Sequence, residues 1–437
     1  MRIFLYSVVT LIVLLASIEL TTRTVSWVSG NGFTLSLHEL DPYDQPVADI
    51  YQWHPFIGFI FQANIKFMGS HPNQKDKAEL FTDQYGFLVG DRGLTYNKPP
   101  NEIRIACIGG STTANINLAF DKNWPGCLGD LIQRHFPEKK IKVINAGTPG
   151  FDTSQSIGNL ALRVMPFHPD IVIIYHAYND LKAIRPEKTF RPDYSHIHTT
   201  PYGFHKEPNF LTKLLHKSML YVRTRNRYRE YIGVSTQPSR PGNSLRISKR
   251  LSYVPQDATR TFEQHIRNLV AIANAGGAEV ILSTFGTLHN PNWDWSIPET
   301  FDRLTDFQKE NFYNILQFTP GLTVEGIFNG LLQYNDVLKE VAIQEKCGLV
   351  DSANLIPHKD TYFVDRVHFS ELGARKMAEN LFPEVLKFLK GTHLSKPEAS
   401  ERRQHYLGFL DVRLASLLTG GSRNNIACKT LGRRISK

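Results

Sequence analysis

The stretch IRIACIGGSTT, residues 103–113, decides how this chain is expected to fold. Its first six residues are mostly apolar and rich in isoleucine, which predicts a buried β-strand. The strand ends at Gly109-Gly110, and a serine and two threonines follow, as is typical of a turn that leads into a helix. A strand, a glycine turn and a helix are the unit from which parallel α/β sheets are built.

The same alternation of strand and helix continues toward the C-terminus. Short apolar runs predict further strands over 142–145, 171–175, 278–284 and 349–350. Helical periodicity and capping residues predict helices over about 124–136, 153–164, 257–275, 324–346 and 371–390. Two segments interrupt the pattern: a basic insertion over 182–256 and an aromatic insertion over 286–322. This pattern predicts a five-stranded parallel sheet with helices on both faces.

An uncharged apolar run, residues 3–18, lies near the N-terminus. A helix of that length spans about 24 Å, and flanking residues can extend it across a hydrocarbon core of about 30 Å. We therefore predict a transmembrane signal anchor over residues 1–23, with the body of the protein periplasmic or at the cell surface. Two alternatives stay open: a cleaved signal peptide of a secreted protein, although no A-x-A-like site follows, and a buried helix.

The composition excludes several classes of protein. With 41% hydrophobic and 21% charged residues, the chain is neither disordered overall nor a polytopic membrane protein. Its formal charge of +9 is concentrated in two segments, because residues 182–250 carry a net +11 and residues 395–437 a net +6, which leaves the remainder at −8. A nucleic-acid partner is therefore not expected, and the basic segments are either solvated surfaces or contacts for anionic lipid or an acidic polymer.

The expected organisation has four parts. An anchor comes first, then a lead-in segment over 24–100 with turn residues and aromatics but no long amphipathic helix, then a catalytic domain over 101–391, and last a basic tail over 392–437. The four cysteines are scattered, so neither a disulfide framework nor a zinc ribbon is expected. His54 and His71 in the lead-in have no partner at metal-site spacing.

Polar residues follow several of the predicted strands. Ser111 comes after the first strand, Gly147 after the second and Asn179 after the third, while Asp365 and His368 precede the last helix. Ligands bind beyond the carboxyl ends of the strands in an open α/β sheet, so these residues are expected to converge on one pocket.

These residue types together suit acyl chemistry. A serine hydroxyl is a weak nucleophile until a base takes its proton, and His368 can be that base because imidazole titrates near neutrality. Asp365 can orient the ring and stabilise the imidazolium. The backbone N–H groups of Ser111 and Gly147 and the side-chain amide of Asn179 can donate to the developing oxyanion. Each motif alone is also typical of a helix cap, a turn, a phosphate-binding loop or a metal site.

On these motifs the sequence resembles the SGNH/GDSL hydrolase family, in its membrane-anchored bacterial branch. The resemblance covers about 101–181 and 257–390. It implies a three-layer α/β/α flavodoxin-like fold with sheet order 2-1-3-4-5, and ester chemistry with no metal and no cofactor. Two positions depart from the family pattern: Gly110 stands where the family name has Asp, and Ala177 stands where a Gly is usual.

The resemblance implies a serine esterase that hydrolyses acyl esters, with small O-acyl groups on a glycan or another cell-envelope component as the expected substrate. Two alternatives stay open: an O-acyltransferase of extracellular polysaccharide that uses the same residues, and a catalytically inactive glycan-binding protein. The expected partners are an acyl-ester substrate and a membrane, which the N-terminal helix contacts.

Overall fold

The structure is a computed structural model. It describes residues 2–29, 33, 50–71, 73–74, 76–90, 94–198, 214–215, 217–231 and 250–391. The basic tail and much of the basic insertion lie outside the described residues.

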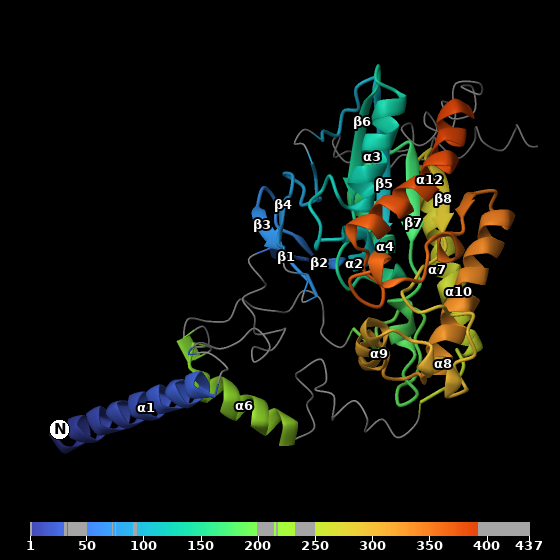
Figure 1. The fold of residues 1–437 in the computed structure, drawn as a ribbon. Coiled ribbons are helices and arrows are strands. Elements are labelled where there is room, and N and C mark those ends of the chain that lie inside the picture. The colour runs from blue at the N-terminus through green and yellow to red at the C-terminus, as the bar shows by residue number, and fades with distance from the viewer. Residues whose placement is uncertain are drawn as a thin grey trace, which may run out of the picture.

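A five-stranded parallel sheet forms the centre of the molecule (Figure 1). Its strands are β5 (Glu102–Gly109), β6 (Lys140–Asn145), β7 (Ile171–Tyr175), β8 (Glu279–Ser283) and β9 (Gly348–Val350). They are arranged in the order β6-β5-β7-β8-β9, which confirms the expected order 2-1-3-4-5. Every residue of the central strand β7 is buried, because helices cover both faces of the sheet.

The helices form two groups, one for each face of the sheet (Figure 1). In one group α3 (Trp124–His135) packs against α12 (Glu371–Gly391). In the other, α4 (Thr153–Asn159) and α10 (Val324–Gln344) both pack against α7 (Gln256–Ala275). The three-layer α/β/α architecture is therefore confirmed. Smaller helices complete it: α8 (Glu299–Asp302) and α9 (Asp306–Phe318) within the aromatic insertion, and α11 (Ser352–Leu355) after β9.

The helix predicted over 153–164 is not a single α-helix. It begins as α4, where Asp152 and Gln155 form a capping box. It continues as a π-helical turn, η1 (Leu160–Val164), and then as a 3₁₀ turn, η2 (Met165–Phe167), that ends at His168 with φ of 51°. Hydrophobic periodicity does not distinguish these local variants, because each leaves the same face of the segment on the core.

The lead-in contains two small antiparallel sheets that the sequence did not predict. One joins β1 (Tyr51–His54) to β2 (Gly58–Phe61), and the other joins β3 (Lys66–Gly69) to β4 (Ala78–Phe81). Phe61, Phe67, Leu80 and Leu88 form a buried cluster with Ala114. Ala114 belongs to α2 (Ser111–Ala114), so the lead-in packs directly on the helix that begins with Ser111.

The N-terminal helix α1 (Arg2–Val28) contains a segment, Phe4–Val28, that is long and apolar enough to cross a membrane. A second helix, α6 (Met219–Tyr231) of the basic insertion, packs against α1. The Glu19 carboxylate joins them, since it accepts hydrogen bonds from the Met219 and Leu220 backbone N–H groups at 2.8 and 3.0 Å. A carboxylate at a helix N-terminus satisfies amides that have no partner within that helix.

A buried ion pair supports the first strand of the sheet. Arg104 is fully buried, and its Nε lies 2.6 Å from Glu102 Oε1. Its Nη1 also donates to the Phe167 carbonyl at 2.6 Å, which joins β5 to the turn before β7.

Replacing Arg104 by Met is expected to lower the free energy of unfolding by about 3–5 kcal/mol, because the buried Glu102 carboxylate loses its closest partner and keeps only the exposed Lys140, whose Nζ lies 3.8 Å from Oε2. The double variant Arg104→Met/Glu102→Leu should regain most of that loss, since no buried charge then remains unpaired. Urea unfolding of the detergent-solubilised chain measures both. Equal stability of Arg104→Met and wild type would contradict this account of the pair.

Candidate active site

Ser111 follows two glycines, Gly109 and Gly110, at a turn that leaves no room for a side chain at either position. A Cβ on Gly109 would come within 2.0 Å of Thr113 Oγ1 and 2.7 Å of the Tyr175 carbonyl oxygen. A Cβ on Gly110 would lie 2.5 Å from Asn179 Nδ2. The two glycines therefore let β7 and the Asn179 side chain approach the start of α2. As the first residue of α2, Ser111 has a backbone N–H with no acceptor inside that helix.

Three of the sequence-predicted residues form one hydrogen-bonded chain. His368 Nε2 lies 2.7 Å from Ser111 Oγ, and His368 Nδ1 lies 2.8 Å from Asp365 Oδ2. Ser111 comes from the end of β5, and the other two come from the loop before α12, so 257 positions of sequence separate the serine from the histidine. In this arrangement the imidazole can accept the serine proton on one nitrogen while the carboxylate holds the other.

Asp365 is held by several donors at once. Its Oδ1 accepts the Val367 and His368 backbone N–H groups at 2.8 and 2.7 Å, and Arg366 Nη1 lies 3.8 Å from Oδ2. Burial of the carboxyl would raise its pKa, but the contacts with His368, His71 and Arg366 outweigh burial and hold the pKa of Asp365 well below its usual range. The group is therefore a carboxylate at neutral pH.

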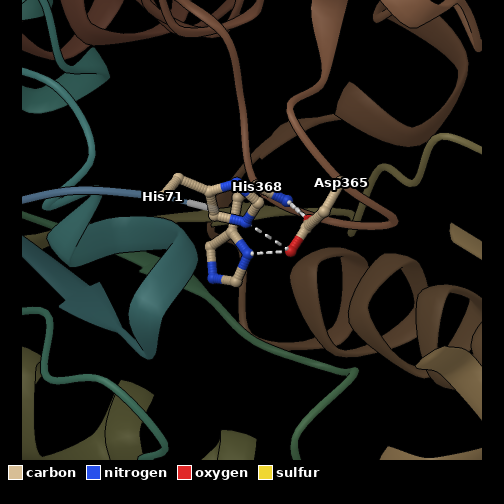
Figure 2. A group of neighbouring side chains, drawn as sticks. All are labelled: His71, Asp365 and His368. Carbon is tan, nitrogen blue, oxygen red and sulfur yellow. Dashed lines mark hydrogen bonds and ion pairs between the residues drawn. The ribbon is translucent and has the colours of Figure 1, made fainter. Parts of the chain in front are cut away.

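His71 of the lead-in also reaches Asp365, and no sequence pattern pointed to it. Its Nε2 lies 3.1 Å from Asp365 Oδ2, the same oxygen that contacts His368. Figure 2 shows the two imidazole rings directed at this one carboxylate. The ligand atoms of the three residues lie within 4.8 Å of one another, a spacing that can also hold a metal ion. The contact spans 294 positions, so neither local spacing nor periodicity can reveal it.

Two of the expected oxyanion donors, Asn179 and Gly147, differ in their position relative to Ser111. Asn179 lies beside the serine turn, where its Nδ2 donates to the Phe151 carbonyl at 2.7 Å. The Gly147 backbone N–H instead donates to Asn145 Oδ1 at 3.1 Å. A Cβ on Gly147 would come within 2.3 Å of the Ala114 backbone nitrogen, so the glycine allows close packing of this loop against α2.

A pocket of about 340 Å³ opens beside Ser111. Ser111, Asn179 and His368 line it, and Gly147 is not among its lining residues. Aromatic rings form one wall: Tyr178 stacks on Phe318 with ring centroids 5.0 Å apart, and on Phe285 at 6.2 Å.

Two further residues shape this pocket. The Arg366 side chain lies over the Phe318 ring, and its Nε donates to the Tyr178 hydroxyl at 2.9 Å. Ala177, which stands in place of the usual glycine, is buried and also lines the pocket, so its methyl group limits the space next to Asn179.

A buried carboxyl group follows Asn179 directly. Asp180 is fully buried, and its Oδ1 accepts both the backbone N–H and the hydroxyl of Thr153, the first residue of α4. Its Oδ2 has no hydrogen-bond partner among the described residues. His176 Nδ1 lies 3.9 Å from this oxygen, but burial lowers the pKa of His176 to about 4, so the ring carries no charge at neutral pH. Burial, together with the nearby charge of Asp152, raises the pKa of Asp180 to about 7. Asp180 thus attaches the loop that carries Asn179 to the start of α4.

Comparison with solved structures finds distant similarity. An α/β hydrolase from the metagenome of Lake Arreo, Spain, shares 15% identity with a TM-score of 0.37, over 68% of this chain and 99% of that one. An acetyl xylan esterase from Geobacillus stearothermophilus shares 16% identity with a TM-score of 0.37, over 67% and 97%. A lipase/acylhydrolase from Enterococcus faecalis shares 17% identity with a TM-score of 0.34, over 66% and 96%. None of the curated proteins compared with this chain matches it.

A serine, a histidine and an aspartate in hydrogen-bond contact at the carboxyl edge of an α/β sheet are an arrangement found in several kinds of hydrolase. The model of the GDSL-like lipase/acylhydrolase family matches residues 107–376, which is more than half of the chain. The chain belongs to this family, and the predicted family resemblance is confirmed. The finer prediction of a membrane-anchored branch stays a prediction.

Asp180→Asn is expected to make stability less dependent on pH. The folded-state pKa of Asp180 lies above its unfolded value of about 4, so its contribution to stability is present below about pH 4. That contribution is lost as the pH rises through about 7. Asn keeps an oxygen for Thr153 and cannot ionise. The unfolding temperature of the variant should therefore rise relative to wild type between pH 5 and 8.

The matched control for this experiment is Asp257→Asn, since the Asp257 side chain is 76% exposed. Its difference from wild type should stay constant over the same range of pH. A constant difference for Asp180→Asn as well would contradict the assignment of a raised pKa to Asp180.

Proposed function

We propose that the chain is a membrane-anchored serine esterase that uses Ser111, His368 and Asp365 as its catalytic triad. One observation carries the proposal: a continuous hydrogen-bonded path of 2.7 and 2.8 Å runs from Ser111 Oγ through the His368 ring to Asp365 Oδ2. Family membership supports ester hydrolysis as the reaction.

The first half of the reaction acylates the enzyme. His368 Nε2 takes the hydroxyl proton as Ser111 Oγ attacks the carbonyl carbon of the ester, and the carbonyl π electrons move to its oxygen. Asp365 stabilises the imidazolium that forms. When the tetrahedral intermediate collapses, the C–O bond to the alcohol breaks and His368 returns the proton to the leaving oxygen.

The second half of the reaction frees the serine. His368 Nε2 takes a proton from water, the resulting hydroxide attacks the acyl carbon, and the acid leaves as Ser111 Oγ regains the proton. Each half passes through an oxyanion. The Ser111 backbone N–H and the Asn179 amide, which lines the pocket, are its donors, and one such donor is worth about 2.7–4 kcal/mol. The Gly147 N–H would become a third donor if its hydrogen bond to Asn145 Oδ1 broke and it donated to the oxyanion instead.

The pocket favours a small acyl group. The space beside Ser111 amounts to about 340 Å³ even with its opening to solvent included. Ala177 and the stacked Tyr178 and Phe318 rings restrict it further. We therefore propose a short O-acyl ester as substrate, carried on a glycan or another component of the cell envelope.

The membrane part of the proposal rests on α1. Its segment Phe4–Val28 contains an 18-residue apolar window that the rest of the described structure leaves unburied, while α6 packs beside the end of the helix. The interaction of Glu19 with α6 places part of the basic insertion beside α1. We propose that α1 anchors the chain and that the catalytic domain lies outside the cytoplasm.

Ser111→Ala and His368→Ala should each reduce hydrolysis of p-nitrophenyl acetate to near background. The double variant should lose little more than either single variant, because the two side chains act in one proton transfer. Labelling by a serine-reactive fluorophosphonate, with the adduct located by mass spectrometry, should occur at Ser111 in wild type and should be absent in Ser111→Ala.

Three outcomes would contradict the triad or the hydrolytic reaction. The first is a wild type that takes no label at any probe size, which favours a binding protein. The second is a double variant that loses far more than either single variant. The third is acyl transfer to a sugar hydroxyl that is faster than hydrolysis, which favours an acyltransferase.

Activity against esters of increasing acyl length should fall beyond short chains, since the pocket is small.

Removal of residues 2–28 should move the protein from the membrane pellet to the soluble fraction after carbonate extraction. The full-length chain should stay in the pellet and keep its full mass of 49.8 kDa. A soluble product that has lost its N-terminal residues would instead establish cleavage of a signal peptide.

A further inference from the structure

The partners of His71 determine which of its ring nitrogens carries hydrogen. His71 Nδ1 lies 3.2 Å from the Asn73 backbone nitrogen and accepts its N–H. The neutral ring then has its hydrogen on Nε2, which donates to Asp365 Oδ2 at 3.1 Å. The lead-in therefore supplies a hydrogen-bond donor to the carboxylate, and not another acceptor.

His368 approaches the same oxygen from the other side. Its Nε2 accepts the Ser111 hydroxyl, so its hydrogen lies on Nδ1 and is donated to Asp365 Oδ2 at 2.8 Å. Two imidazoles thus donate to one oxygen, while the other oxygen accepts two backbone amides. With donors on both oxygens, rotation of the Asp365 side chain would break hydrogen bonds on both sides of the carboxylate.

The lead-in also binds the backbone of this loop. Asn73 Nδ2 donates to the Val364 carbonyl at 2.8 Å, one residue before the carboxylate. The loop itself is closed by the Val364 N–H, which donates to the His368 carbonyl at 2.9 Å. His71 and Asn73 therefore contact both a side chain and the backbone of the loop that carries the proposed base.

We propose that His71 is a positioning residue of the active site, whose Nε2–H holds the Asp365 carboxylate in the orientation that receives the N–H of His368. The inference rests on the proposed function, because it assigns His71 a role in the Ser111–His368–Asp365 triad. His71 lies 36 positions before the first residue of the family match at 107, so part of the active site comes from outside the family domain.

The catalytic consequence follows from the tautomer of His368. When the carboxylate is correctly placed, hydrogen stays on Nδ1 and Nε2 is free to accept the serine proton. Loss of that contact lets the ring place its hydrogen on Nε2, and a ring in this tautomer cannot act as the base. Among the described residues, the titratable groups that face Asp365 are the two imidazoles, and the charged group is the Arg366 guanidinium. Its Nη1 lies 3.8 Å from Oδ2 and does not replace the lost donor.

Two substitutions of His71 by an amide residue test whether the Nε2–H donor matters, independently of the rest of the imidazole ring. In His71→Gln the side-chain nitrogen extends about as far as Nε2 of histidine, whereas in His71→Asn it stops short. We expect His71→Asn to lower kcat for p-nitrophenyl acetate by about ten- to hundredfold, the scale of a small misplacement of a catalytic group. KM should stay unchanged, because His71 does not line the pocket. His71→Gln should keep kcat within about threefold of wild type.

The full-length chain in detergent is the sample, and the rate of fluorophosphonate labelling at Ser111 is measured beside kcat. His54→Gln is the matched control: His54 is another lead-in histidine, at the end of β1, and its Nδ1 accepts the Phe56 N–H at 3.4 Å. This control should behave as wild type in both assays. Unfolding temperatures of all variants identify any loss of activity that results from unfolding.

The outcomes separate this inference from the proposed function. A wild type that neither hydrolyses ester nor takes the label overturns both. An active wild type whose His71→Asn variant has unchanged kcat and labelling rate overturns the role of His71 alone. A folded His71→Gln variant with kcat more than tenfold reduced also overturns the donor role, and it decides the question if His71→Asn does not fold. Loss of wild-type activity in EDTA with recovery on adding Zn²⁺ would make His71 a metal ligand instead.

Discussion

The close approach of backbone at Gly109-Gly110 is the constraint on which the fold and the site both depend. Because neither residue has a side chain, the Tyr175 carbonyl of β7 and the Asn179 amide approach the turn between β5 and α2. The same turn directs Ser111 out of the sheet at the start of a helix, with a free amide beside its hydroxyl. A methyl group at either glycine would separate the strand, the proposed nucleophile Ser111 and the proposed oxyanion donor Asn179.

Two aspartates near this turn have pKa values that are shifted in opposite directions. Asp365 accepts hydrogen bonds on both oxygens and stays ionised, so it can stabilise a positive charge on His368. Asp180 is more deeply buried, lies near the charge of Asp152 and has no hydrogen-bond partner for one oxygen among the described residues, so its pKa rises toward neutrality. Asp365 is therefore the carboxylate available to the proposed base His368, while Asp180 attaches the Asn179 loop to α4 through Thr153. The difference between them comes from the number of donors that each environment supplies.

The lead-in contacts the proposed active site at two places, although it precedes the part of the chain that matches the family. Its small sheets pack on α2, and its His71 and Asn73 contact the loop that carries Asp365 and His368. The first contact supports the proposed nucleophile and the second supports the proposed base. The family match begins only at residue 107, so the segment before it contributes contacts to the surroundings of the proposed triad.

The residue pattern alone was enough to predict the parallel sheet and the meeting of Ser111 with His368 and Asp365, while the strand order was implied by the family resemblance. Apolar strands, glycine turns and helical periodicity are local patterns, and parallel strands bring their carboxyl ends to one edge. Only the tertiary structure revealed His71, the bond between Gly147 and Asn145, and the burial of Asp180. Contacts such as that of His71, across 294 positions, depend on how the segments pack, and burial depends on what covers a residue; spacing along the chain encodes neither.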